Sequence, residues 1–506
     1  MNRIAKKYLF VCLAVSVLLA GGCIYNQSVT ASAASAPSAA KSLVVAIEQT
    51  RKIKVNENDG IIQSKAFKST NSKIAVVSKK GEVTAKKAGN CNIKITVKYA
   101  VNGKVLTKAL KMKVIAVVPS PSDLKALKKI TKEQKAAGVK MPDVKSKWYI
   151  WSANGRLISI DLEAYNLKGS ISFQAFTKLQ VLYLESSKLT EIGVSGCEEL
   201  KDLGCSGSKI TKLDVSNCKK LEFLFCRRNA LTELNVSGCK KLIWLLCEEN
   251  QLTELNLSGC KELVELSCDS NRLSELDMGD CRKLKFLSCK SNGMRILDVS
   301  DNQKLKILDC EANWLTELDV SQCKELEGLS CVSNQLTGLN VSNNKKLGQL
   351  WCWKNELMEL DVSSNKELWE LFCGQNQLTQ LDVNNCKKTL KNLYCSENQL
   401  TKLDVRGCKK LESLECAGNQ LIKLTIGSQT KLKELECGGN QLKQLDVSGC
   451  KKLEILDCIW NPLTKLNLSA CKKLEELYCT KKVKLKGVPK KCYVKRTDKK
   501  SNFGDM

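Results

Sequence analysis

Cysteine is the residue type with the most chemical potential in this 506-residue chain, which has 28 Cys and no His. The missing His excludes Ser-His-Asp catalysis, Cys-His catalysis and any His-ligated metal site. No C-x-x-C pair occurs, so a zinc site is poorly supported. We also find no phosphate-binding Gly loop and no paired carboxylates in a plausible cleft. The sequence therefore predicts neither an enzyme nor a bound metal or cofactor.

The spacing of the cysteines defines a repeat. Cys205 to Cys373 are spaced by 21 residues, one step of 22 leads to Cys395, and steps of 21 continue to Cys479. Each of these 14 coils has the form L-x-x-L-x-C-x-x-N-x-L-x-x-L-x-V-x-x-C, as in the coil that runs from Leu221 to Cys239. A short repeat cannot bury its apolar face alone, so such coils must stack into a solenoid. We expect each coil to add one strand to a parallel ladder, on the half that carries Cys and Asn.

This pattern resembles the leucine-rich repeat, in the short-coil form of internalin-type bacterial surface proteins. The resemblance covers residues 151–480 and implies a solenoid with a parallel β-sheet on its concave face. Proteins of this kind bind other macromolecules, so the resemblance also implies an adhesion role.

Twenty-four cysteines fall in two ladders inside this repeat. In-register side chains of parallel strands point the same way. Their Cβ atoms therefore stay farther apart than the Cβ–Cβ distance of roughly 3.8 Å that a disulfide requires. We favour buried apolar thiols over disulfides, and disulfides over a metal. The recurring Asn, from Asn229 to Asn461, should satisfy backbone groups of adjacent coils.

Side chains that flank the strand leucines should face the sheet surface, where a ligand would bind. The candidates are aromatic and form two groups. The main patch consists of Trp351, Trp353, Phe372 and Tyr394, and an earlier group consists of Phe223, Phe225 and Trp244. Adjacent exposed aromatics suit a protein or glycan partner, although they could instead stabilise the sheet by cross-strand packing. The last coils are acidic at the same positions, with Glu415, Glu434, Glu436, Asp457 and Glu476.

Residues 43–118 contain short β-rich runs separated by turn residues, and Ile93, Ile95, Val97 and Tyr99 alternate with polar residues as in a half-buried strand. The stretches Ala66–Val77, Gly81–Ala85 and Ala88–Ile93 resemble the group 2 bacterial immunoglobulin-like domain, with Phe67 where that family usually has Trp. The resemblance implies a β-sandwich that serves as a spacer on exported surface proteins. The fold class expected is therefore mainly β, a sandwich followed by a solenoid.

The N-terminus has the features of an export signal. Arg3, Lys6 and Lys7 precede a 12-residue apolar segment that is too short to span a bilayer. Two outcomes stay open: a signal peptide of residues 1–33 that ends at an A-x-A site, or one of residues 1–22 that leaves Cys23 to be lipidated. Residues 34–42 read as a flexible tether, residues 119–150 as a linker with a capping helix begun by Asp123, and residues 481–506 as a C-terminal cap with a basic tail.

The net charge of +28 is concentrated in the flanks of the chain. Residues 41–150 carry 25 basic and 7 acidic side chains, whereas residues 151–480 are close to neutral. A nucleic-acid partner is therefore not expected on the solenoid, although the basic N-terminal domain could contact cell-wall polyanions or anionic lipid. Together these features predict an extracellular or cell-surface binding protein, with a structural scaffold of the envelope as the alternative.

Overall fold

The computed structural model describes residues 38–56, 61–101 and 104–497. The predicted signal segment 1–33, Cys23 and most of the basic tail lie outside these residues. The described chain divides into two compact units, residues 38–251 and residues 252–497, which we take in turn.

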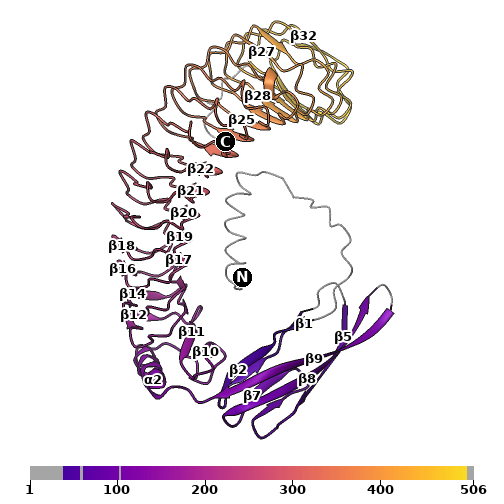
Figure 1. Ribbon diagram of the computed structural model, residues 1–506. Coiled ribbons are helices and arrows are strands. Elements are labelled where there is room, and N and C mark those ends of the chain that lie inside the picture. Colours follow the sequence, from indigo (N-terminus) through magenta and orange to yellow (C-terminus); the bar gives the residue numbers. More distant parts are fainter. Residues whose placement is uncertain (1–37, 57–60, 102–103, 498–506) are drawn as a thin grey trace. The chain divides into compact units, whose positions relative to one another are not determined.

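The first unit begins with two packed sheets (Figure 1). One has four strands in the order β2-β9-β8-β5, the other three in the order β3-β7-β6, and β1 pairs with β4. Their bounds are β1 Ser38–Ala39, β2 Ser42–Ala46, β3 Thr50–Lys52, β4 Val55–Asn56, β5 Ile61–Ser69, β6 Ala75–Val77, β7 Glu82–Ala85, β8 Gly89–Val101 and β9 Lys104–Val117. This is the immunoglobulin-like sandwich that the sequence predicts.

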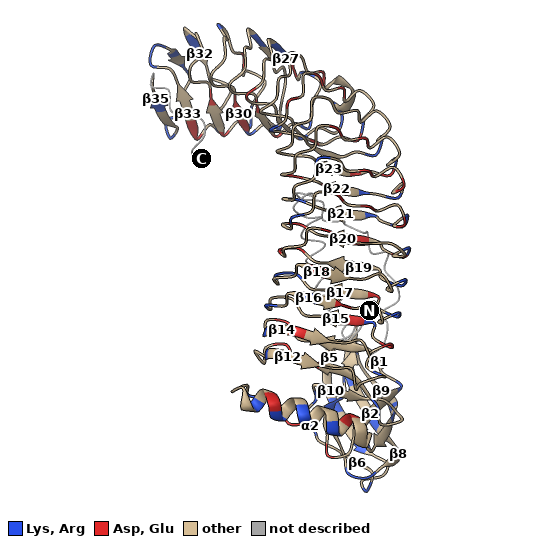
Figure 2. Cartoon of the chain, turned by 90° about the vertical axis from the view of Figure 1, so that its left-hand side faces the viewer, with Lys and Arg blue, Asp and Glu red and all other residues tan. Residues whose placement is uncertain are grey.

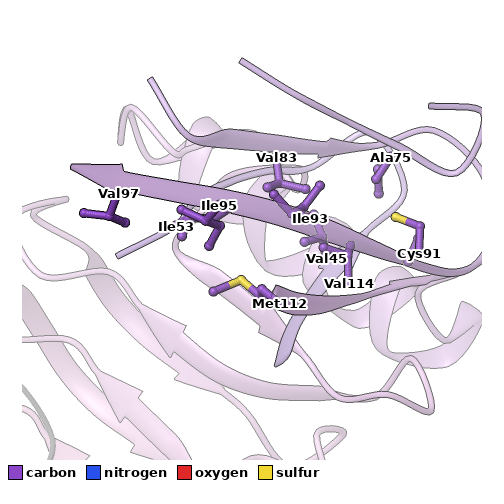
Figure 3. Close-up of a cluster of buried hydrophobic side chains, with 12 residues drawn as sticks. Val45, Ile53, Ala75, Val83, Cys91, Ile93, Ile95, Val97, Met112 and Val114 are labelled. Atoms are coloured by element: carbon purple, nitrogen blue, oxygen red, sulfur yellow. The ribbon is translucent and has the colours of Figure 1, made fainter. Parts of the chain in front are cut away.

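The alternation along β8 explains how the sandwich forms. Ile93, Ile95 and Val97 are buried, while Lys94, Thr96 and Lys98, which alternate with them, are exposed. Successive side chains of a strand point to opposite faces, so one face of β8 enters the core and the other meets solvent. Figure 3 shows these residues packed with Val83 and Met112.

One helix, α2 Pro121–Ala136, follows the sandwich, with Pro at its start as helices favour. The sequence predicts Asp123 as its N-cap, which is wrong: Ser120 is the N-cap residue and its side chain makes no capping bond. Asp123 is completely buried, and its carboxylate accepts hydrogen bonds from Arg156 Nε at 2.8 Å, Arg156 Nη2 at 2.9 Å and the Leu157 amide at 2.8 Å. The carboxylate therefore ties the helix to the first coil.

The sandwich contacts the same region. The buried Gln49 side chain donates to the Ser146 and Tyr149 carbonyls, both at 2.7 Å, and Arg51 Nη1 donates to the Lys147 carbonyl at 2.8 Å. Segment 145–149 is thus hydrogen-bonded to the sandwich rather than being free linker.

The rest of the first unit is stacked coils. Apart from the antiparallel pair β10–β11, the sheet strands run parallel, and they are β10 Tyr149–Trp151, β11 Leu157–Asp161, β13 Val181–Tyr183, β15 Asp202–Gly204, β17 Phe223–Phe225 and β19 Trp244–Leu246. Short parallel pairs form on the other half of the coils, from β12 Lys168–Ser172, β14 Lys188–Gly193, β16 Lys212–Asp214 and β18 Glu233–Asn235.

The second unit continues the same arrangement, with its sheet on the inner side of its bend (Figure 1). The sheet strands are β20 Glu265–Ser267, β21 Phe286–Ser288, β22 Ile307–Asp309, β23 Gly328–Ser330, β24 Gln349–Trp351, β25 Glu370–Phe372, β26 Asn392–Tyr394, β28 Ser413–Glu415, β30 Glu434–Glu436, β31 Ile455–Asp457, β33 Glu476–Cys479 and β35 Tyr493–Arg496. The other half carries η1 Asn384–Cys386, β27 Lys402–Asp404, β29 Lys423–Thr425, β32 Lys465–Asn467 and β34 Lys484–Lys486. The strand lies on the half with Cys and Asn, as predicted.

Asparagine links each coil to the one before. Asn334 Nδ2 donates to the carbonyls of Cys310 at 3.0 Å and Cys331 at 3.1 Å, and its Oδ1 accepts from the Leu315 amide at 3.0 Å. One buried side chain thereby satisfies three backbone groups of two coils, which is the role that the sequence predicts.

The cysteines of both ladders are buried free thiols, and no disulfide is formed among the cysteines that the structure describes. In the second ladder a thiol and an amide make equivalent bonds. Cys323 Sγ points to the Val299 carbonyl at 3.6 Å, whereas Asn344 Nδ2 donates to the Val320 carbonyl at 2.9 Å. This equivalence explains why Asn replaces Cys at some turns.

Candidate ligand-binding surface

The aromatic side chains of the second unit lie on one register row of the sheet. In β24, β25 and β26 the buried leucine is followed by Trp351, Phe372 and Tyr394, which pair directly across neighbouring strands. The leucine points inward, so the next side chain points to the sheet surface. Three rings are therefore spaced at about the strand separation of 4.8 Å.

The rings contact one another. Trp351 and Phe372 stack with centroids 5.5 Å apart and planes at 7°, and Phe372 meets Tyr394 edge-on at 4.2 Å. Trp353 lies two residues beyond Trp351, past the end of the strand, and is 38% exposed. We call Trp351, Trp353, Phe372 and Tyr394 the aromatic platform. Its three sheet rings are half-buried, so each keeps a face or edge in solvent.

A carboxylate fixes the first ring. Glu370 is 6% exposed, and its oxygens accept hydrogen bonds from Trp351 Nε1 at 3.0 Å, Gln349 Nε2 at 2.9 Å and Asn392 Nδ2 at 3.0 Å. Our sequence analysis missed this network. Aligning the residue before each strand leucine would have found it, because Gln349, Glu370 and Asn392 occupy equivalent positions.

The same register row continues with carboxylates. Tyr394 pairs with Glu415, Glu415 with Glu436, and Glu436 with Asp457. Three like charges directly opposite one another on adjacent strands are destabilising. Glu434 lies on β30 with Glu436, and Glu476 lies on β33, the strand that follows Asp457 in the sheet; Figure 2 shows the acidic residues on β30 and β33. We call these five residues the acidic flank.

The electrostatics of the acidic flank reflect this crowding. Burial and the neighbouring carboxylates of Glu436 and Glu434 raise the pKa of Glu415 to about 7. Burial, followed by Asp457 and Glu434, raises the pKa of Glu436, and burial raises that of Asp457. The surroundings of the flank therefore disfavour the charged form of these carboxylates.

Cations compensate acidic residues elsewhere on the coils. Lys220 pairs with Glu199 at 2.6 Å, Lys283 with Glu262 at 2.6 Å and Lys346 with Glu325 at 2.5 Å, each from one coil to the coil before. Among the residues that the structure describes, no such ion pair reaches the acidic flank; beyond it, Lys495 lies 5.9 Å from the centre of the Tyr478 ring.

The earlier aromatic group is only partly exposed. Phe223 and Trp244 are half-buried and meet edge-on at 5.2 Å. Phe225, which we predicted to face a ligand, is 1% exposed. It lies between Gly204 and Leu246 in the register, and it is packed against the sheet rather than presented to solvent. This group thus offers two rings, not three.

Other sites are not evident in the part of the chain that the structure describes. No three His, Cys, Asp or Glu side chains there are arranged to hold a metal ion. No described helix is both long and apolar enough to cross a membrane. A hollow of about 1790 Å³ runs along the other half of coils 295–402, but its aspartates already accept backbone hydrogen bonds at the turns, as Asp319 does from the Ser321 amide at 2.8 Å.

Comparisons with known proteins agree with this architecture. The sequence matches the family of leucine rich repeats (2 copies) over residues 388–426 and the group 2 bacterial Ig-like domain over residues 26–108. A search of curated proteins finds no significant match.

Several solved structures are similar. The functional domain of InlJ from Listeria monocytogenes, which includes a cysteine ladder, is 32% identical over 55% of this chain and 68% of that chain, with a TM-score of 0.47. YopM from Yersinia enterocolitica is 19% identical over 75% and 91%, with a TM-score of 0.51. The plant peptide hormone receptor RGFR1, solved in complex with RGF2, is 20% identical over 67% and 70%, with a TM-score of 0.55. The last two show the fold alone.

Together these findings define a leucine-rich-repeat solenoid that follows an immunoglobulin-like domain. The chain contains leucine-rich repeats of the matched family and a group 2 bacterial immunoglobulin-like domain at its N-terminal end.

Proposed function

We propose that this chain is an exported, adhesin-like protein of the bacterial cell surface that binds a partner protein on the sheet face of its second unit. One observation carries the proposal: a single register row presents three aromatic rings and then three carboxylates. The repeat does not require either, because its core is built of leucine, cysteine and valine.

The chemistry of the row favours a protein over a glycan. The aromatic platform offers apolar, stacking surface of the kind that dominates protein interfaces. The acidic flank lacks cationic partners among the described residues, so it would gain most from lysine or arginine side chains of the partner. We infer a partner segment that places apolar residues on the platform and cations on the flank.

The test is to replace the platform. A variant with Trp351→Ser, Trp353→Ser, Phe372→Ser and Tyr394→Ser should lose capture of proteins from a protein and glycan array. The matched control replaces four exposed apolar residues elsewhere in the same unit, Ile296, Trp314, Met358 and Ile422, which are 77%, 55%, 61% and 58% exposed. Thermal unfolding of both variants checks that the coils remain folded.

The competing proposal is a structural component of the envelope without a specific external ligand. It predicts no specific array signal for the natural protein, and equal behaviour of the two quadruple variants. A signal confined to glycans, lost with the platform, would keep the binding surface and replace the partner class.

Export and anchoring rest on the N-terminal sequence. We propose secretion by the signal segment 1–33, or 1–22 followed by lipidation of Cys23, with the immunoglobulin-like domain as spacer. Cys23→Ala should release the protein from the membrane fraction into the medium if Cys23 is lipidated, and leave its distribution unchanged if residues 1–33 are removed. The basic immunoglobulin-like domain would add Coulomb attraction to anions of the envelope.

A further inference from the structure

The outer face of the four-stranded sheet β2-β9-β8-β5 is strongly basic. Lys94 and Lys98 of β8 point away from the core, since Ile93, Ile95 and Val97 point into it. Lys68 of β5 and Lys111 and Lys113 of β9 lie on the same face and are also exposed. The only acidic residues in the described part of the domain are Glu48 and Glu82, and neither belongs to this sheet.

Three of these lysines form a row across adjacent strands. Lys68 pairs directly with Lys94, and Lys94 with Lys111. Neighbouring strands are about 4.8 Å apart, so the row concentrates three like charges and costs stability in the free protein. Folding alone does not account for it, whereas a bound anionic surface would offset the repulsion.

One end of the same face is apolar. Ile61 pairs with Ala100, and Ala100 with Val105, which puts both aliphatic side chains on the outer side with the lysines. Ile61 is 75% exposed and Val105 is 56% exposed. Residues 94 and 100 of β8 are about 20 Å apart at roughly 3.4 Å per residue. The two aliphatic side chains and the row of lysines can therefore contact the same flat surface.

The two features together select the partner. A soluble polyanion would use the lysines and leave the aliphatic side chains in water. A bilayer interface uses both, because apolar side chains enter the headgroup boundary while lysines are attracted to anionic lipids.

We propose that this sheet face docks on the surface of an anionic lipid bilayer, with Lys68, Lys94, Lys98 and Lys111 on headgroup phosphates and Ile61 and Val105 in the interface. The proposal rests on the proposed location at the cell surface. It does not depend on the aromatic platform, which lies in the other unit.

The experiment measures binding of the processed chain to vesicles of equal parts phosphatidylcholine and phosphatidylglycerol, and to vesicles of phosphatidylcholine alone. The chain is produced from residue 34 onward, so that neither the signal segment nor an acyl group on Cys23 contributes. We expect binding to the anionic vesicles only. The triple change Lys68→Gln, Lys94→Gln and Lys111→Gln should weaken it roughly tenfold or more, since each lysine near such a surface contributes substantially.

Matched controls come from the solenoid. Lys219→Gln, Lys240→Gln and Lys451→Gln remove the same charge from exposed turns and should change vesicle binding less than about twofold. Ile61→Ser with Val105→Ser should weaken binding, whereas Ile296→Ser with Ile422→Ser should not.

Three results would overturn the proposal. Equal losses in the lysine variant and its control would mean that only net charge matters. Indifference to the Ile61 and Val105 changes, together with full displacement by soluble polyphosphate, would replace the bilayer with a polymeric anion. Absence of binding to anionic vesicles would remove the site, and would leave the test of the aromatic platform unaffected.

Discussion

A cysteine in this solenoid takes the place of a small aliphatic side chain. The Sγ atoms of Cys226, Cys289 and Cys352 are fully buried among leucines, and burial raises the pKa of each thiol well above its usual value. Only the thiolate is nucleophilic, so these groups are inert at neutral pH. A chain rich in cysteine can thus be exported without forming disulfides within the ladders.

We therefore expect the ladder thiols of the native protein not to react with a water-soluble thiol reagent. Cys492, which is only partly buried, should react first, and all the cysteines of the purified chain should react after denaturation. The measurement is reagent release with time, with and without guanidinium. Fast reaction of many native thiols would contradict a packed ladder.

Glu415 gives a residue-scale prediction about pH. Its pKa is raised from 4.5 to about 7, so the folded protein binds this proton more tightly than the unfolded chain. The contribution of Glu415 to the free energy of unfolding is therefore largest below pH 4.5 and is lost as the pH rises through about 7.

Glu415→Gln should raise the free energy of unfolding by on the order of 1 kcal/mol at about pH 8 and have little effect at about pH 4. Equilibrium unfolding at the two pH values measures this. Glu359→Gln, at an exposed carboxylate on the other half-coil, is the control and should show no comparable difference. A stabilisation that is the same at both pH values would show that the carboxylate charge is not its cause.

Two residues show where sequence reasoning ends at this scale. The repeat period predicts Phe225 on the exposed sheet surface, but the ring is buried, because its exposure depends on how its cross-strand neighbours pack. Asp123 has the residue type of an N-cap, yet the Arg156 guanidinium and the Leu157 amide bind its carboxylate instead of the helix end. Both outcomes depend on residues distant in the sequence.

At the scale of the element, the Asn ladder explains how one coil specifies the next. The amide of Asn334 bonds to carbonyls of its own coil and of the coil before, so removing it leaves several buried backbone groups without a partner. Each such group costs about 1–3 kcal/mol.

Asn334→Ala should lower the free energy of unfolding by about 2–4 kcal/mol, measured by denaturant titration. Asn343→Ala, at an exposed turn, is the matched control and should cost much less. Asn344→Cys should be tolerated better than Asn344→Ala, because a thiol occupies the equivalent position in neighbouring coils and points to the same kind of carbonyl. Equal costs at Asn334 and Asn343 would refute the structural role of the ladder.

Elements were more predictable than surfaces. Repetition of the sequence predicts the period of 21 residues, the half-coil that carries the strand and the burial of leucine and cysteine. In a stack of equivalent coils, each residue lies next to the equivalent residue of the neighbouring coil. The continuity of the row from Trp351 to Asp457 does not follow so directly. It requires the register across six strands, including the coil of 22 residues before Cys395, which the sheet accommodates while Phe372 still pairs with Tyr394. The lysine row of the sandwich likewise appears only when strands distant in sequence are paired.

At the scale of the molecule, the ends of a solenoid are its weak points, because a terminal coil has a neighbour on one side only. In the first unit, α2 and the sandwich both bond to the segment that precedes the first parallel strands. The charges are unevenly distributed as well: lysines concentrate on the sandwich, whereas on the coils some of the charged side chains form ion pairs from one coil to the next. Net charge alone would misrepresent both surfaces.

The cap supplies the last prediction. Asp123→Asn keeps one hydrogen-bond acceptor but removes the charge that faces Arg156, and we expect a loss of about 2 kcal/mol and faster proteolysis within residues 121–160. Asp143→Asn, at an exposed position, should leave the proteolysis rate unchanged. Arg156→Met alone should also destabilise the cap, and the double variant should lose less than the sum of the two single variants, because each single change leaves a polar partner unsatisfied. Strict additivity would mean that the helix is held by apolar packing, with the ion pair contributing nothing to the cap.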